Sequence, residues 1–119
     1  MNVLILEDEP LIAMAMEALV EDEGWNVVGP FSVVADAVAA IAGGALIDCA
    51  LLDCNLGGAP SWPVAELLAA RDISFAFSSG QSAADIEPRF ANRPCFAKPI
   101  DETKVKLFLA GLAATRISG

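Results

Sequence analysis

Short apolar runs alternate along the whole chain with longer amphipathic segments, and this alternation limits the fold more than any other feature. The apolar runs have the length of strands and cover residues 2–6, 25–29, 48–52, 73–78 and 95–97. The longer segments between them leave room for the crossover helices that parallel strands need. The pattern predicts an α/β fold, a three-layer sandwich around a five-stranded parallel sheet. Strand order 2-1-3-4-5 is one common order for such a sheet, and it is the order expected here.

Capping residues and helical spacing predict four helices. The first runs from about Pro10 to Glu23, with its proline in the first turn. The apolar residues that recur at helical spacing along it are Leu11, Ala15, Ala18 and Leu19. Ser32, Ser61 and Asp101 are the expected N-terminal caps of the other three helices. The last helix has one predicted apolar face, formed by Val105, Phe108, Leu109 and Leu112.

The alternation breaks between Gly80 and Pro94, where a fourth crossover helix would be expected. Pro88, Pro94 and scattered polar residues interrupt that segment. We expect the helix at about residues 81–93 to be short, irregular or absent. We also expect the segment to be mobile.

The composition sets the class of protein. A chain of 119 residues, 55% of them hydrophobic, can form one domain over residues 1–119 without disulfides. Cys49, Cys54 and Cys95 show no C-x-x-C spacing and the sequence has no histidine, so we interpret them as reduced thiols. The lack of histidine also excludes Ser-His-Asp and Cys-His mechanisms.

Charge and hydropathy point to a cytoplasmic protein. The formal net charge of -9 disfavours binding to nucleic acids and to anionic membrane surfaces. The first apolar run is too short for a signal peptide and runs directly into acidic residues, and no apolar run approaches membrane-spanning length. We therefore expect no nucleic acid and no membrane among its partners.

Acidic residues follow two of the predicted strands at their carboxyl ends. Glu7 and Asp8 come after the first strand, and Asp53 comes after the third. Strand order 2-1-3-4-5 makes these two strands neighbours, so the three carboxylates are expected to share one crevice. Carboxylates held so close repel each other, and a hard divalent cation relieves the repulsion. Magnesium is the natural candidate.

The fourth and fifth strands add a hydroxyl and a positive charge to the same edge. Ser79 follows the fourth strand and Lys98 follows the fifth. A carboxylate can attack phosphorus when metal, lysine and hydroxyl groups neutralise the phosphoryl oxygens. Asp53 is the predicted nucleophile because it stands alone at its strand end, whereas the adjacent Glu7-Asp8 pair is suited to bind metal.

Four motifs in this order resemble the receiver domain of two-component response regulators. They are Val-Leu-Ile-Leu-Glu-Asp-Glu-Pro at 3–10, Leu-Leu-Asp-Cys-Asn-Leu at 51–56, Ser79-Gly80 and Lys98-Pro99. Each motif is weak alone, but together they span nearly the whole chain in register with the strand and helix pattern.

The resemblance implies a role for each matching residue. Glu7 and Asp8 would be the acidic pair that binds Mg²⁺, and Asp53 the phosphoacceptor. Asn55 would give its backbone carbonyl to the metal. Ser79 and Lys98 would bind the phosphoryl group, and the peptide bond between Lys98 and Pro99 would be cis.

The resemblance also implies partners for a stand-alone receiver. A histidine kinase or a histidine phosphotransfer protein would supply the phosphoryl group, and a downstream protein target would read the phosphorylated surface. The chain itself would be a signalling domain rather than an enzyme, and a monomer or weak homodimer.

Two features depart from the family pattern. The first is the irregular segment between Gly80 and Pro94, because the corresponding helix is part of the signalling surface in most receivers, and we expect signalling here to work through order and disorder of this segment. The second is a single position in the last strand. Three residues before the lysine the family commonly has a tyrosine or phenylalanine, and this chain has Cys95. Phe96 is one place away and, by strand alternation, is expected to face the opposite side of the sheet. The usual aromatic switch is therefore in question here.

Two other functions fit the same fold. The first is a protein-interaction domain that works without phosphorylation, which Cys95 and the irregular segment favour. The second is a small flavin-binding protein of the flavodoxin type. That protein would need a phosphate-binding loop after the first strand, where Glu7, Asp8 and Glu9 would repel a phosphate.

Overall fold

A five-stranded parallel sheet forms the middle of the protein. The computed structural model describes residues 1–80 and 86–118. The strands of this sheet are β1 (Asn2–Leu6), β2 (Asn26–Phe31), β3 (Cys49–Asp53), β6 (Ser74–Ser79) and β7 (Cys95–Ala97). They pair in the order β2-β1-β3-β6-β7, every neighbour parallel. The predicted fold class and strand order are confirmed.

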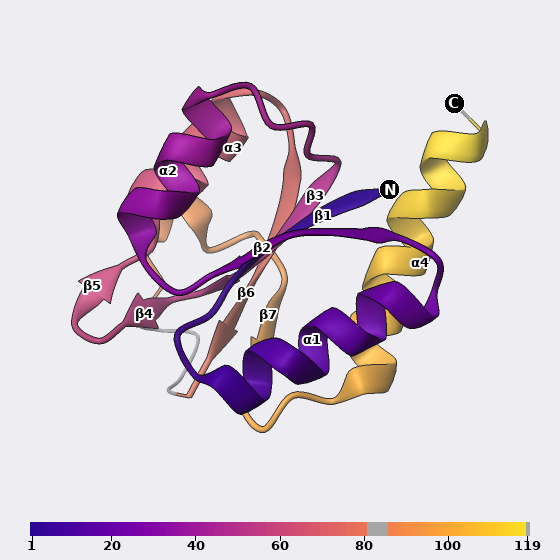
Figure 1. Ribbon diagram of the computed structural model, residues 1–119, viewed down its shortest axis with the longest axis horizontal. Helices are drawn as coiled ribbons and strands as arrows, with labels where there is room; N and C mark the ends of the chain where they lie inside the picture. The colour runs from indigo at the N-terminus through magenta and orange to yellow at the C-terminus, as the bar shows by residue number, and fades with distance from the viewer. Residues whose placement is uncertain (81–85, 119) are drawn as a thin grey trace.

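Four helices cover the two faces of the sheet (Figure 1). They are α1 (Pro10–Asp22), α2 (Val34–Ala42), α3 (Trp62–Ala70) and α4 (Glu102–Ser118). Figure 1 shows α1 and α4 on one side of the strands and α2 and α3 on the other. No helix in the described part of the chain is long and apolar enough to cross a membrane.

Each face of the sheet has its own apolar cluster. The α2/α3 face is built on Leu4, Leu52, Phe75 and Phe77, with Ile86 and Phe90 from the segment before β7. The α1/α4 face is built on Val3, Ile5, Leu51 and Ala76 with residues of the two helices, including Val105 and Leu109. Successive residues of one strand therefore belong to different clusters, as strand alternation requires. Phe75 is 1% exposed and is one of the largest buried side chains of the α2/α3 face.

The buried face of α1 differs from the predicted one. Leu11 is 82% exposed, and of the four apolar residues singled out in the sequence only Leu19 is buried. The buried residues of the helix are Ala13, Met16, Leu19 and Val20. The prediction was wrong because apolar residues lie all around this helix, so helical spacing alone does not select one face.

The predicted caps have different outcomes. Asp101 accepts hydrogen bonds from the backbone N–H groups of Thr103 and Lys104 at 2.9 and 3.3 Å, which confirms it as a cap. Ser61 holds the cap position of α3, but its hydroxyl makes no capping hydrogen bond. The prediction for Ser32 was wrong, because α2 begins one residue later than expected and Val33 holds its cap position.

Strand β2 is longer than predicted and continues through Gly29 and Pro30 to Phe31. The peptide bond between Gly29 and Pro30 is cis, and Gly29 has a φ of 104°. The register with β1 shifts between Leu4 and Leu6 at this point. Proline is tolerated because β2 is an edge strand, where one missing N–H donor breaks no further pairing.

Between β6 and β7 the described residues form one short turn instead of a helix. This turn is the 3₁₀-helix η2 (Pro88–Phe90). Residues 86–94 therefore agree with the prediction of a short or irregular crossover, whereas residues 81–85 lie outside the described residues. The predicted mobility of the segment stays a prediction.

Candidate functional site

The polar residues singled out in the sequence meet at the carboxyl edge of the sheet. Glu7 and Asp8 follow β1, Asp53 ends β3, Ser79 ends β6, and Lys98 directly follows β7. Because all five strands are parallel and β1, β3, β6 and β7 are successive neighbours, their carboxyl ends lie side by side. The sheet therefore brings together residues that are up to 91 positions apart in the sequence.

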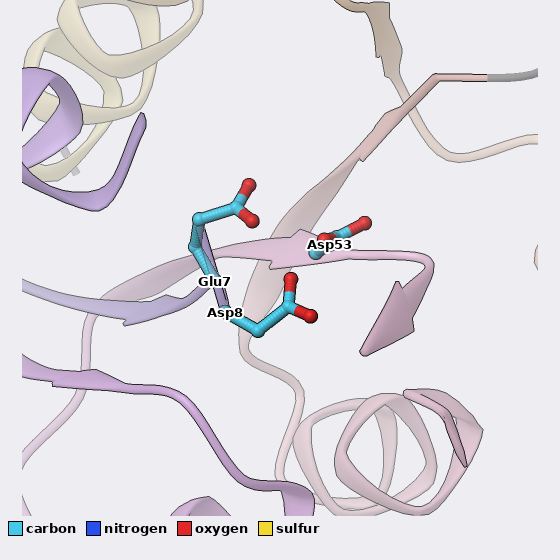
Figure 2. Close-up of side chains that lie close together, drawn as sticks. All are labelled: Glu7, Asp8 and Asp53. Carbon is cyan, nitrogen blue, oxygen red and sulfur yellow. The ribbon is translucent and has the colours of Figure 1, made fainter. Parts of the chain in front are cut away.

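Three carboxylates form the centre of this edge. Glu7, Asp8 and Asp53 each offer an oxygen, and the three atoms lie within 4.8 Å of one another. Figure 2 shows these side chains gathered where β1 and β3 end. Glu7 is 2% exposed and Asp53 is 5% exposed, so water solvates neither of them freely. The predicted crevice of three acids is present.

Among the cationic side chains that the structure describes, Lys98 is the one in contact with Glu7 and Asp53. Its Nζ lies 3.0 Å from Oε1 of Glu7 and 3.2 Å from Oδ2 of Asp53. Glu9 adds a third carboxylate at 3.5 Å, on a side chain that is 61% exposed. The peptide bond from Lys98 to Pro99 is cis, as the resemblance implied.

The ionisation of Glu7 and Lys98 reflects this crowding. Burial raises the pKa of Glu7 to about 7, although hydrogen bonds from the Glu9 backbone and from Lys98 oppose the rise. The neighbouring Asp53 raises the pKa of Glu7 further. Burial alone would lower the pKa of Lys98, but the hydrogen bonds and charges of Glu7 and Asp53 outweigh it and raise that pKa.

One oxygen of Glu7 has an incomplete environment. Nζ of Lys98 donates a hydrogen bond to Oε2 at 3.4 Å, and the Glu9 N–H donates to the same oxygen at 3.1 Å. Oε1 is buried and accepts no hydrogen bond from the described residues, so its contact with Lys98 is an ion pair alone. A buried carboxylate oxygen in this condition suits a hard cation.

A small hairpin after Asp53 forms one side of the crevice. Its strands are β4 (Asn55–Leu56) and β5 (Ala59–Pro60). The N–H of Asn55 donates to Oδ1 of Asp53 at 3.3 Å, and the N–H of Gly58 donates to Oδ1 of Asn55 at 2.7 Å. Gly57 and Gly58, with φ of 61° and 97°, supply the turn. The Asn55 side-chain oxygen is thus engaged within the hairpin.

The edge residues open onto a cleft of about 540 Å³. Asp8, Asp53, Asn55, Ser79 and Lys98 all line it, as does Trp62. Ser79 is 5% exposed and lines the cleft, whereas the adjacent Ser78 is not among the lining residues.

The sequence reasoning missed two members of the site. Trp62 packs against the core on the α2/α3 face and also lines the cleft. Glu9 was noted only as an acid, although it lies beside Lys98. The sequence did hold a signal for Trp62: it is the first residue of the helix that follows the Asp53 loop, so it had to lie near Asp53.

Two cysteines lie near the site. Cys54 is 7% exposed and lines the cleft beside Asp53. Cys95 packs against the α2/α3 cluster and Phe96 against the α1/α4 cluster. The prediction that these two neighbours face opposite sides of the sheet is confirmed.

Similar proteins identify the class. No protein-family model matches the chain. The solution structure of SdrG from Sphingomonas melonis Fr1 is 47% identical, with a TM-score of 0.81 over 94% of this chain and 95% of that one. The receiver domain of the response regulator PhyR from Erythrobacter litoralis is 28% identical, with a TM-score of 0.80 over 94% and 88%. The chain therefore belongs to the response regulator receiver family.

Two further comparisons give similar proteins, a second structure of SdrG and a full-length PhyR. The BeF3-activated conformation of SdrG from Pseudomonas melonis Fr1 is 46% identical, with a TM-score of 0.76 over 93% of this chain and 94% of that one. The phyllosphere-induced regulator PhyR of Methylorubrum extorquens is 68% identical over 28 residues, which are 24% of this chain and only 10% of that protein.

Proposed function

We propose that this receiver accepts a phosphoryl group on Asp53 from a histidine kinase or a histidine phosphotransfer protein. A carboxylate oxygen of Asp53 attacks the phosphorus of a phosphohistidine, and an acyl phosphate forms. The phosphorus–nitrogen bond breaks, and its electron pair returns to the imidazole of the donor. The phosphorylated chain, as a monomer or weak homodimer, then acts on a downstream protein through its surface.

The observation that carries this proposal is the position of Lys98. Its ammonium lies 3.2 Å from Oδ2 of Asp53, at the edge of a cleft that both residues line. Phosphoryl transfer depends mainly on positioning and on neutralising the charge of the phosphoryl oxygens. An ammonium in contact with the proposed nucleophile, with the Ser79 hydroxyl in the same cleft, meets both requirements.

The acidic residues fit a magnesium ion. Three carboxylate oxygens lie within 4.8 Å of one another, and Oε1 of Glu7 is buried without a hydrogen bond from the described residues. We propose that Glu7, Asp8, Asp53 and the backbone carbonyl of Asn55 hold Mg²⁺. When bound, the ion would neutralise charge on the carboxylates and on the incoming phosphoryl group.

The test is phosphorylation of the purified chain. Incubation with a phosphorylated histidine phosphotransfer protein and Mg²⁺ should add one phosphoryl group by intact mass, labile to base as an acyl phosphate is. Asp53→Asn should take up none, because an amide is a poor nucleophile. Asp48→Asn, at the residue directly before the same strand, should be phosphorylated like the unaltered chain.

Metal removal separates the parts of the proposal. Chelation of Mg²⁺ should stop the uptake, and added Mg²⁺ should restore it. Uptake that persists in Asp53→Asn would assign the phosphoryl group to another residue. Beryllofluoride is a mimic of the phosphoryl group. If the unaltered chain takes up neither a phosphoryl group nor beryllofluoride, a phosphorylation-independent interaction domain, which Cys95 favours, becomes the better interpretation.

A further inference from the structure

One wall of the crevice is an aromatic ring with two different surroundings. Trp62, the first residue of α3, lines the cleft together with Asp53 and Lys98. The rest of its half-buried side chain packs against the apolar cluster on the α2/α3 face. The indole therefore belongs both to the polar site and to the core.

Two phenylalanine rings hold this indole. Trp62 meets Phe77 edge to face, with ring centroids 5.5 Å apart and planes at 84°. It also lies 6.1 Å from Phe90, with an angle of 36° between the planes. Phe77 stands on β6 two residues before Ser79, and Phe90 ends the turn η2. A displacement of the indole would disturb both contacts, because the ring is rigid.

Phe90 does not itself line the cleft. It is 5% exposed and packs against Phe75 and Phe77, with ring centroids 5.8 and 6.1 Å away. Its N–H donates to the carbonyl of Glu87 at 2.9 Å, which closes the turn. Next to it, Arg89 forms ion pairs with Glu66 of α3 and with Glu87. The turn is thus tied both to the indole inside and to the surface of α3 outside.

Strand β7, next to β6, has no aromatic side chain opposite Phe77. Phe77 pairs in register with Cys95 of β7, a small side chain that packs against the same cluster. The aromatic support of the crevice wall on this face therefore comes from η2 and β6.

We infer that Phe90 and Phe77 position Trp62 as a wall of the crevice, so that occupancy of the crevice and packing of the Pro88–Phe90 turn are coupled. The inference deepens the proposed function, since it concerns the same crevice. Coupling between two sites is reciprocal. A substitution that loosens the turn must therefore weaken ligand binding in the crevice, and a bound ligand must stabilise the turn. Phe90 acts here as a positioning residue.

The first test measures beryllofluoride affinity at saturating Mg²⁺ by fluorine NMR, which needs no tryptophan signal. Phe90→Leu should weaken binding by at least about fivefold, the lower end of typical coupling between sites. The matched control is Phe108→Leu, which removes a half-buried ring from a pair with Phe96 on the other face, 5.9 Å apart. It should change the affinity by less than this roughly fivefold threshold.

A conservative substitution separates positioning from simple loss of packing. Trp62→Phe keeps a ring against Phe77 and Phe90 and should retain most of the affinity, whereas Trp62→Leu should not. The reciprocal measurement uses the unaltered chain: beryllofluoride with Mg²⁺ should slow amide exchange at Phe90 and Ala91, whose N–H groups close the turn. This measurement decides the matter even where Phe90→Leu does not fold.

The outcomes are distinct. Equal affinities for Phe90→Leu and Phe108→Leu, or turn amides that exchange at the same rate with and without ligand, overturn the coupling and leave the proposed function intact. An unaltered chain that takes up no beryllofluoride overturns the proposed function and the coupling with it.

Discussion

The middle of the sheet and its carboxyl end differ sharply, although one residue separates them along each strand. Leu6, Leu52 and Phe77 are 0% exposed and lie within the apolar cluster. The residues that follow them are Glu7, Asp53 and Ser78, which are also buried but polar. The difference teaches that burial serves two purposes here: apolar burial stabilises the fold, and polar burial creates chemistry at some cost in stability.

The cost has a physical origin at two of these polar residues, Glu7 and Ser78. Burial raises the pKa of Glu7 to about 7, which means that its charged form is disfavoured. The hydroxyl of Ser78 is buried and has no hydrogen-bond partner among the described residues. A fold selected only for stability would avoid both features, and functional sites commonly keep such features. Substitutions in the two regions should therefore have effects of opposite sign.

The largest effect is expected in the middle of the sheet. Leu52→Ala removes a fully buried side chain from β3 and leaves a cavity between the sheet and its helices. The free energy of unfolding should fall by about 2–5 kcal/mol, measured by urea denaturation.

The control for this substitution is Leu107→Ala in α4. Leu107 is 69% exposed, so the same change should alter the free energy of unfolding by no more than about 0.5 kcal/mol. A similar loss for both variants would show that burial does not set the difference between the regions.

The next effect concerns Glu7 and has the opposite sign. Its pKa is raised from 4.5 to about 7 in the folded chain. Between these two pH values the folded state keeps a proton on Glu7 that the unfolded state has released. In metal-free buffer the contribution of Glu7 to stability is therefore full below pH 4.5 and is lost as pH rises through about 7. Glu7→Gln should flatten this pH dependence and make the chain more stable at alkaline pH.

Urea denaturation across this pH range checks the prediction. The matched control is Glu17→Gln on α1, which should leave the pH dependence unchanged. A steeper fall in stability for Glu7→Gln than for the unaltered chain would contradict the argument, because it would mean that the charged carboxylate stabilises the fold. Magnesium should reverse the preference, since it requires the charged form of Glu7.

Much of the difference between the regions can be predicted from the sequence. The apolar runs end just before Glu7, Asp53 and Ser79, and the strand and helix alternation predicts parallel strands, whose carboxyl ends lie at one edge of the sheet. The positions of Asp8 and Lys98 at the same edge followed from the same reasoning. Local patterns were sufficient because each strand carries its own apolar run and its own polar end.

Other features could not be predicted because they depend on packing between distant segments. The buried face of α1 depends on its packing against β1 and α4, since apolar residues lie on several sides of the helix. The place of Trp62 beside the cleft depends on Phe77 and Phe90. The extension of β2 through Pro30 depends on its position at the edge of the sheet.

The smallest effect is expected at Ser78. Substitutions of Ser78 and of the adjacent Ser79 should have different consequences. Ser78 is 2% exposed and its hydroxyl has no partner among the described residues, whereas Ser79 lines the cleft. Ser78→Ala removes a buried polar group that makes no hydrogen bond, so it should stabilise the chain by about 1 kcal/mol. Ser79→Ala should bring no such gain and should weaken beryllofluoride binding instead. Thermal unfolding and fluorine NMR measure the two effects, and a destabilised Ser78→Ala would show that its hydroxyl is satisfied and that polar burial at this end of the sheet costs less than we argue.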